Sequence, residues 1–312
     1  MTDRIAFIFP GQGAQYPGMG RDFYGKYPEA KAVFDRADAL LERPFSKLIF
    51  DGPKEELTLT KNSQLAIFIT SVAILEVFKV HYPDMKPAVC AGLSLGEYTA
   101  LVAAGYLSFE EALPIVEARG QYMHEACEAN RGVMHVVLGL DLGAVEKVMA
   151  PIDGVWIANL NCPGQIVLSG TPEGVEAAAA LLKEAGARRV MPLDVSGAFH
   201  SGLMQSAQDR LEPIIQEASL SPSTTDIVMN VPGNFTRDLN EMRGNITKQV
   251  TQSVLWQKGI EAILDRGIDL FIEMGPGKTL AGMNKRIGVT LPTTSIENVE
   301  DLEGASQHAT LS

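Results

Sequence analysis

Four short apolar runs stand apart along the chain, and each is followed by a glycine or proline turn and then by helix-forming sequence. They cover residues 5–9, 88–91, 227–230 and 270–274. Unbroken apolar runs of this length, without an alternating polar side, indicate strands that are buried on both faces. Because these strands alternate with helices, the pattern predicts an α/β fold built on a mostly parallel sheet with helices covering it.

The middle of the chain has a different pattern. Strand-like runs at 134–140, 155–160, 165–169 and 188–193 enclose helical sequence at 142–149 and 173–184. Thr171 and Pro172 provide an N-cap and a proline at the first position of the second helix. The order β-α-β-β-α-β is that of the ferredoxin-like unit. Since signals of the parallel sheet resume after it, this unit is predicted to be an insertion.

The pattern therefore predicts two subdomains and a tail. Residues 1–130 and 196–297 are expected to form a large discontinuous subdomain, and residues 131–195 a small ferredoxin-like one. Residues 298–312 offer few apolar side chains to bury, and we expect them to form a mobile tail.

The longest apolar segment, residues 65–78, carries Thr70, Ser71 and Glu76 and is shorter than a membrane span requires. We expect a buried helix there and no membrane association. The N-terminus shows neither a cleavable signal nor a transit peptide, so a cytoplasmic location is expected.

Charge and cysteine usage narrow the class of protein. The chain has 312 residues and a net charge of −12, which argues against general nucleic-acid binding. Its three cysteines are far apart, which predicts no disulfide framework and no metal site. The turn at Gly11-Gln12-Gly13 lacks the third glycine of a dinucleotide loop. We therefore expect no cofactor and no metal.

A Gly-x-Ser-x-Gly sequence at 92–96 lies between the second apolar run and a helix-forming segment. A strand, this turn and a helix form the context of a nucleophile elbow, in which Ser94 would be exposed at the top of the sheet. The amide of Leu95 and that of Gln12 would then face a developing oxyanion. The structural alternative is that Ser94 merely caps the following helix.

A serine nucleophile needs a base, and His200 is the preferred one of five histidines. It lies in the turn where the chain returns from the insertion to the large subdomain, and loops at such junctions line clefts. Asp194 is near it in sequence, but a backbone carbonyl is an equally good partner for the imidazole. Arg119 lies in an apolar helix, where position alone favours a surface side chain.

Several motifs in one order resemble malonyl-CoA:acyl-carrier-protein transacylases, over about residues 5–287. They are Phe-Pro-Gly-Gln-Gly-Ala-Gln (9–15), Gly-Leu-Ser-Leu-Gly-Glu (92–97), Arg-Gly (119–120), Asn-Cys-Pro-Gly-Gln-Ile-Val-Leu-Ser-Gly (161–170), Gly-Ala-Phe-His-Ser (197–201) and Glu-Met-Gly-Pro-Gly-Lys (273–278). The resemblance implies an α/β-hydrolase-like core with a mostly parallel sheet and an inserted ferredoxin-like subdomain.

The resemblance also implies roles for individual residues. Ser94 would be the nucleophile and His200 the base, with oxyanion amides from Gln12 and Leu95. Arg119 would bind the malonyl carboxylate, which reverses its interpretation as a surface residue. The main-chain carbonyl of Gln249 would orient the histidine.

Two positions depart from the family pattern, and one run agrees with a subclass. Leu93 stands where many members carry histidine, and Ser253 stands where proline is common, which is expected to loosen the turn behind His200. Phe199, within the Ala-Phe-His-Ser run, and Leu95 match the malonyl-selective pattern, and Phe199 is expected to contact substrate.

The expected reaction is a ping-pong transfer from malonyl-CoA to acyl carrier protein that supplies fatty acid synthesis. Lys278, Lys285 and Arg286 are expected to dock the acidic carrier protein, and a monomer is expected. Three alternatives remain: a serine thioesterase or esterase, a discrete acyltransferase of polyketide synthesis, and a non-catalytic module with a relict site.

Overall fold

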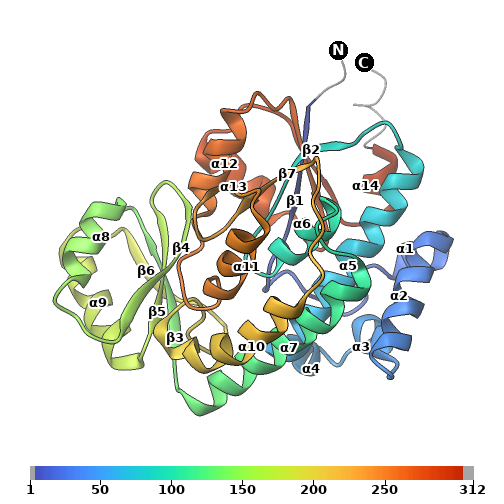
Figure 1. The fold of residues 1–312 in the computed structure, drawn as a ribbon. Coiled ribbons are helices and arrows are strands. Elements are labelled where there is room, and N and C mark those ends of the chain that lie inside the picture. The colour runs from blue at the N-terminus through green and yellow to red at the C-terminus, as the bar shows by residue number, and fades with distance from the viewer. Residues whose placement is uncertain (1–3, 305–312) are drawn as a thin grey trace.

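The computed structural model describes residues 4–304, and its centre is a six-stranded sheet (Figure 1). The strand order is β10-β9-β1-β2-β7-β8. The strands are β1 (Ile5–Phe9), β2 (Pro87–Gly92), β7 (Asp226–Met229), β8 (Asn234–Phe235), β9 (Leu270–Met274) and β10 (Thr293–Ile296). All neighbours are parallel except β7 and β8. The four strands predicted from apolar runs are confirmed, whereas β8 and the polar edge strand β10 were missed.

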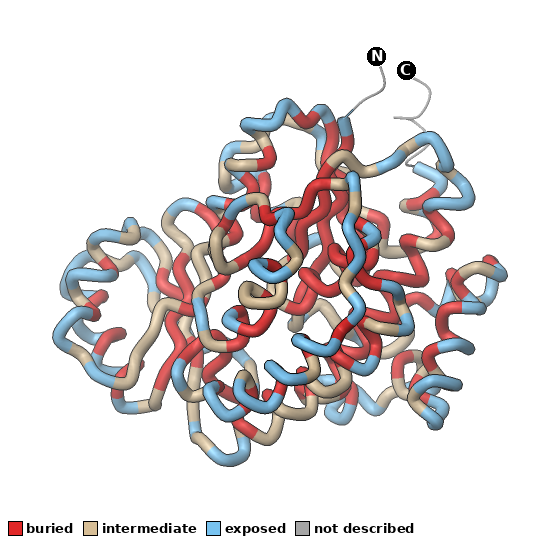
Figure 2. Tube along the Cα trace, viewed as in Figure 1, coloured by how far each residue is buried: buried red, intermediate tan, exposed pale blue. Residues whose placement is uncertain are grey.

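Both faces of this sheet are buried, as the unbroken apolar runs predicted. In β1, Phe7 and Phe9 join one hydrophobic core, while Ala6 and Ile8 join a second core on the opposite face. Figure 2 shows the strands as buried segments at the middle of the molecule. The carboxyl ends of β1, β2 and β7 thereby share one protected edge.

The helices of the large subdomain cover the two faces of the sheet. They are α1 (Arg21–Lys26), α2 (Pro28–Leu40), α3 (Phe45–Asp51), α4 (Lys54–Thr58), α5 (Thr60–His81), α6 (Gly96–Ala103), α7 (Phe109–Ala129), α10 (Gln205–Glu217), α11 (Leu239–Lys248), α12 (Trp256–Leu264), α13 (Thr279–Ile287) and α14 (Val299–Gly304), with a 3-10 turn at Gly202–Met204.

Helix α5 is longer than the segment predicted from its apolar residues. By length and composition its 22 residues are enough to cross a membrane, but 83% of its most apolar window is buried inside the protein. A helix that is apolar all round matches such a position in a core. The expected buried helix is thus confirmed, and its length was underestimated.

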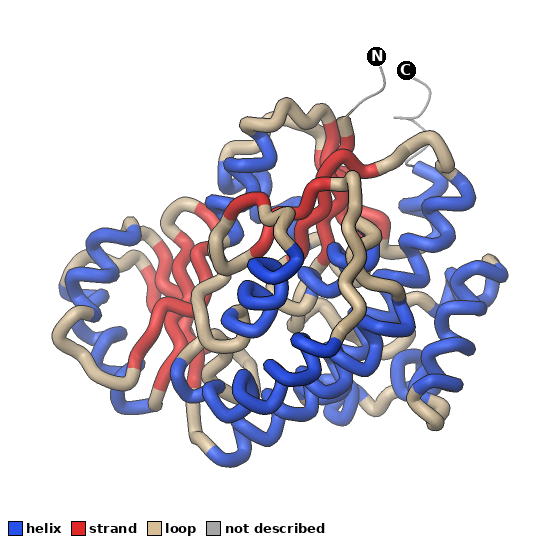
Figure 3. Tube along the Cα trace, viewed as in Figure 1, coloured by secondary structure: helices blue, strands red, loops and turns tan. Residues whose placement is uncertain are grey.

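The ferredoxin-like insertion is confirmed and forms the second sheet, at the left of Figure 1. Its elements are β3 (Val133–Leu138), α8 (Leu142–Met149), β4 (Val155–Cys162), β5 (Gln165–Gly170), α9 (Pro172–Glu184) and β6 (Arg189–Pro192), with strand order β4-β5-β3-β6. Helices α8 and α9 pack on one face (Figure 3), where Val137 and Leu168 belong to their core. Val136 and Val167 point to the opposite face and join the core of the large subdomain.

The two crossings between the subdomains lie side by side. A Cβ atom on Gly132 would lie 2.5 Å from Cβ of Ala198, and one on Gly197 would lie 2.2 Å from Sγ of Cys127. Glycine is therefore required where the outgoing and returning chains touch. We propose that the subdomain boundaries fall at these crossings, near residues 131 and 195.

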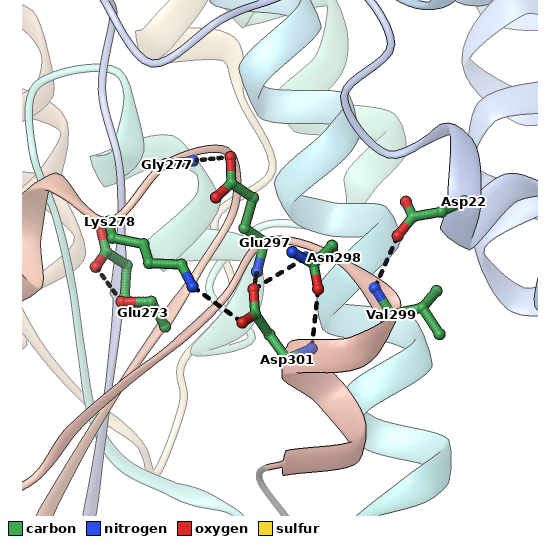
Figure 4. Close-up of polar contacts among 9 residues, drawn as sticks. Asp22, Glu273, Gly277, Lys278, Glu297, Asn298, Val299 and Asp301 are labelled. Atoms are coloured by element: carbon green, nitrogen blue, oxygen red, sulfur yellow. Dashed lines mark hydrogen bonds and ion pairs between the residues drawn. The ribbon is translucent and has the colours of Figure 1, made fainter.

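The expectation of a mobile tail is wrong for residues 298–304. Asn298 Oδ1 accepts a hydrogen bond from the Asp301 amide, and the Asp301 carboxylate accepts from the amides of Glu297 and Asn298 (Figure 4). This is the reciprocal arrangement of a capping box, and it starts α14. Leu302 is 1% exposed and packs into the main core, so this segment does bury apolar surface. Residues 305–312 lie outside the described residues.

Candidate active site

Ser94 lies in a strained turn between β2 and α6. Its φ of 51° is positive, which is uncommon for a residue with a side chain. The flanking glycines are required by close backbone approach, since a Cβ on Gly92 would lie 1.9 Å from the Gly96 oxygen and one on Gly96 would lie 2.2 Å from the Phe9 oxygen. The structure thus has the local geometry that the Gly-x-Ser-x-Gly sequence predicts.

His200 meets Ser94 although 106 residues separate them. Its Nε2 lies 2.8 Å from Ser94 Oγ, and its Nδ1 lies 2.7 Å from the main-chain oxygen of Gln249. Because a carbonyl only accepts, Nδ1 carries the proton and Nε2 is free to accept one from Ser94. Asp194 is exposed and is not the partner of the imidazole.

The imidazole is kept neutral by its surroundings. Burial first, and then the charge of Arg119, lower the pKa of His200 to about 4. Since the neutral form is the one that takes a proton, the site holds a base ready near pH 7.

Arg119, on α7, points into the same place and is only 1% exposed. Its Nη2 lies 3.1 Å from Ser94 Oγ and 2.9 Å from Gln249 Oε1, while Nη1 donates to Gln64 Oε1. Burial lowers the pKa of Arg119. The surface position favoured by the helix pattern alone is therefore wrong, and a guanidinium fork instead lies beside the serine.

A second set of polar residues, which sequence reasoning missed, supports this arrangement. Asn230 Oδ1 accepts from the Ser94 amide at 2.7 Å, and its Nδ2 donates to the Gly92 oxygen at 2.7 Å. Asn230 directly follows β7, and the carboxyl end of a central parallel strand is where sites form in open α/β sheets. That position was the signal available in the sequence. Glu97 and Gln64 carried no comparable signal, because both lie within apolar helices.

The two turns proposed to hold an oxyanion are packed against each other. Leu95 precedes α6 as its N-cap, and Gln12 lies in the turn after β1. A Cβ on Gly11 would lie 2.4 Å from the Leu93 oxygen, so this turn reaches the elbow only because it carries glycine. The side chain of Gln12 lies 3.4 Å from both Thr60 Oγ1 and Gln64 Nε2.

A cavity of about 200 Å³ opens between the two subdomains at this point. Its wall from the large subdomain contains Gln12, Leu93, Ser94, Phe199 and His200. Its wall from the insertion contains Met134, Asn159, Asn161, Val167 and Leu193. Leu93, at the position where histidine is common, contributes an apolar side chain to this cavity.

Ser253 links the insertion to the loop behind His200. Its hydroxyl donates to the Ile157 oxygen at 2.5 Å, and the adjacent Val254 amide donates to the Ala158 oxygen at 2.8 Å. The Ser253 hydroxyl therefore adds a hydrogen bond between the two units, and the loosening expected from the absence of proline stays a prediction.

The three residues proposed to dock a partner have different surroundings. Lys278 Nζ is 2.9 Å from Asp301 Oδ1, and Arg286 Nη1 donates to Gln165 Oε1 at 2.6 Å (Figure 4 shows the first contact). Lys285 is exposed on α13. Over residues 4–304, no group of three or more His, Cys, Asp or Glu side chains is arranged to hold a metal ion.

Comparison with known proteins gives one family. The model of the acyl transferase domain matches residues 6–298. The malonyl CoA-acyl carrier protein transacylase of Bacillus subtilis (strain 168) is 44% identical over 97% of this chain and 96% of its own length.

Solved structures agree with this result. The acyl carrier protein S-malonyltransferase of Vibrio cholerae is 37% identical, with a TM-score of 0.93 over 97% of this chain and 99% of that one. A type II PKS acyl-carrier protein in complex with its malonyl-transacylase contains a chain that is 34% identical, with a TM-score of 0.93 over 98% of this chain and 99% of that one.

Proposed function

Because this chain belongs to the acyl transferase domain family, we propose that it transfers the malonyl group of malonyl-CoA to the phosphopantetheine thiol of acyl carrier protein. The observation that carries the proposal is the buried Arg119 guanidinium, 3.1 Å from the Ser94 hydroxyl. An acyl group that ends in a carboxylate would place that carboxylate on the guanidinium and its thioester at the serine.

The first half-reaction forms a malonyl-serine ester. Ser94 Oγ attacks the thioester carbonyl while His200 Nε2 takes the hydroxyl proton. The carbon–sulfur bond then breaks, and the proton on His200 passes to the departing CoA thiolate. The Gln249 carbonyl keeps the imidazole in the tautomer that this exchange needs.

The second half-reaction repeats these steps in the opposite direction. His200 takes the proton of the carrier-protein thiol, the thiolate attacks the malonyl-serine carbonyl, and the proton returns to Ser94 as its ester bond breaks. The amides of Gln12 and Leu95 are proposed to hold the oxyanion in both halves, a contribution of about 10²–10³ in rate per donor in comparable sites.

Phe199 and the carrier-protein partner complete the proposal. Phe199 lines the cavity beside His200 and is proposed to contact the acyl chain. Docking of the carrier protein is proposed at Lys278, Lys285 and Arg286, around α13, which borders the cavity through Thr279 and Met283.

The product is proposed to supply fatty acid synthesis in the cytoplasm, with the enzyme acting as a monomer without a cofactor or metal. Cys90, Cys127 and Cys162 are free thiols, which fits a reducing compartment. Transfer for polyketide synthesis is a second candidate, because one similar structure is a complex with a type II PKS carrier protein.

Intact-protein mass spectrometry tests the proposal and separates its rivals. The wild-type chain should gain one malonyl group on addition of malonyl-CoA, and the adduct should clear when carrier protein is added. A thioesterase would lose the adduct to water without carrier protein. A non-catalytic module would form no adduct. The Ser94→Ala variant is the negative control for adduct formation and for adduct loss.

A further inference from the structure

Arg119 poses an electrostatic problem that its direct contacts do not solve. It is 1% exposed, and a charge so deeply buried is costly unless it has a counter-charge. Its three hydrogen-bond partners, Ser94, Gln64 and Gln249, are all neutral. The Tyr98 ring, whose centroid lies 5.5 Å from the guanidinium carbon, is also uncharged. Within residues 4–304, Arg119 forms no ion pair with a carboxylate.

The carboxylate that compensates the charge of Arg119 is that of Glu97, and the side-chain amide of Gln249 lies between the two groups. Gln249 accepts from Arg119 Nη2 at its Oε1 and donates from its Nε2 to Glu97 Oε1 at 3.0 Å. Glu97 is fully buried, and its second oxygen accepts from the Asn230 amide at 2.5 Å. The side chain of Gln249 thus bridges a buried cation and a buried anion.

We propose that Glu97 is a positioning residue which, through the side chain of Gln249, holds Arg119 at the nucleophile and so sets the preference for acyl groups that end in a carboxylate. This inference rests on the proposed function and concerns how its substrate is selected. It assigns Gln249 a second role, carried by the side chain, beside that of its main-chain carbonyl.

The bonding pattern shows which form of Glu97 the site requires. Both oxygens accept hydrogen bonds, as an ionised carboxylate does. Burial raises the pKa of Glu97, and the backbone amide of Asn230, the charge of Arg119 and the side-chain amide of Gln249 oppose that rise. Burial likewise lowers the pKa of Arg119, and Tyr98 and Glu97 oppose that change. Each charge therefore stabilises the other.

Glu97 determines which way the side-chain amide of Gln249 is turned, that is, which partners face its oxygen and its nitrogen. Its nitrogen faces three acceptors, which are the Glu97 carboxylate, the Ser94 main-chain oxygen at 2.9 Å and, at 3.5 Å, Asn230 Oδ1. Its oxygen must therefore face Arg119. In the Glu97→Gln variant, the side-chain oxygen of the new glutamine would keep the hydrogen bond from the backbone amide of Asn230. Its side-chain nitrogen would then face the side-chain nitrogen of Gln249, and two donors would meet. Turning the Gln249 amide to relieve this contact would aim a donor at Arg119 and an acceptor at the Ser94 oxygen.

The test compares two acyl donors in the wild type and in Glu97→Gln. We expect kcat/KM for malonyl-CoA to fall by about 10- to 100-fold, mostly through KM, as a charged hydrogen bond at the carboxylate is misplaced. The same constant for acetyl-CoA, which has no carboxylate, should change less than about threefold. Equal losses for the two donors would overturn the proposal.

Glu273, on strand β9 of the large subdomain, offers a matched control. Its carboxylate is also buried, but it accepts from the amides of Leu280 and Ala281 and from Ser295 Oγ, away from the serine. Glu273→Gln should lower the melting temperature as Glu97→Gln does, yet leave the malonyl-to-acetyl ratio unchanged. A changed ratio in this control would overturn the proposal, since any lost buried carboxylate would then act alike.

A second variant tests the proposal in case the Glu97→Gln protein does not fold. Gln249→Leu keeps the main-chain carbonyl and the carboxylate but removes the bridge, so it should lose malonyl preference in the same way; a preserved preference would overturn the proposal. Failure of the proposed function itself looks different, because the wild-type chain would then form no malonyl adduct.

Discussion

The two walls of the candidate catalytic cavity differ in how their side chains are held. On the large-subdomain wall, Ser94 and His200 are tied by hydrogen bonds into the parallel sheet and its loops. On the wall from the insertion, Met134, Val167 and Leu193 are apolar, and Asn161 Oδ1 is buried with no partner among the described residues. We therefore expect the first wall to carry the chemistry, and the second to contact the acyl group without taking part in bond making.

The largest effect is expected on the first wall, from Ser94→Ala. It should remove malonyl-enzyme formation altogether and lower transfer by about 10³-fold or more, as loss of a nucleophile does in comparable enzymes. Mass spectrometry and a carrier-protein transfer assay measure both, with an unchanged circular dichroism spectrum as the control for folding. A malonyl adduct on the Ser94→Ala variant would show that a residue other than Ser94 is the nucleophile.

Arg119→Ala should have the next largest effect. Malonyl transfer should fall by about 10²-fold, because the carboxylate loses a charged partner in a dry site, while acetyl transfer should fall less. Competition between the two CoA esters for the enzyme measures the ratio directly. Equal losses for both donors would contradict the proposed binding of the malonyl carboxylate by Arg119.

The pH dependence sharpens the comparison because the imidazole of His200, on the first wall, has a shifted pKa. The pKa of its imidazole is lowered from 6.5 to about 4, so the base stays neutral as the pH falls through 6.5 and becomes protonated only near 4. Below that pH the rate of malonyl-serine formation should fall about tenfold per pH unit. A fall in this rate already near pH 6.5 would mean that the imidazole is hydrated rather than buried.

The smallest effect is expected on the second wall, from Asn161→Ala. Since Asn161 Oδ1 makes no hydrogen bond within the described residues, its removal should change the free energy of unfolding by less than about 1 kcal/mol. The rate of malonyl-serine formation at saturating malonyl-CoA should stay within about threefold of the wild type. A loss as large as that of Arg119→Ala would show that the second wall takes part in the chemistry.

Sequence reasoning found the elements whose signals are local. The apolar run before Gly92 and the glycines around Ser94 predicted both the strand and the elbow, because backbone strain and close packing act over a few residues. The ferredoxin-like insertion was recognisable for the same reason, from its order of strands and helices.

Reasoning from the local sequence pattern failed where the burial of a residue depends on partners that are distant in sequence. The burial of Arg119 follows from the positions of Gln64 on α5 and Gln249 after α11, which no window around residue 119 reveals. Likewise β10 is polar at its edge of the sheet and was missed. The start of α14 carried a local signal, Asn298 with Asp301 three residues later, which a composition-based expectation of a tail overlooked.

The adjacent crossings at Gly132 with Ala198 and Gly197 with Cys127 have an evolutionary meaning. The insertion leaves and rejoins the large subdomain at one place, so it is continuous in sequence and interrupts none of the strands of the parallel sheet. If the proposed function holds, we expect acceptance of new acyl groups to evolve through the wall from the insertion, while Ser94, His200 and Arg119 in the large subdomain are retained.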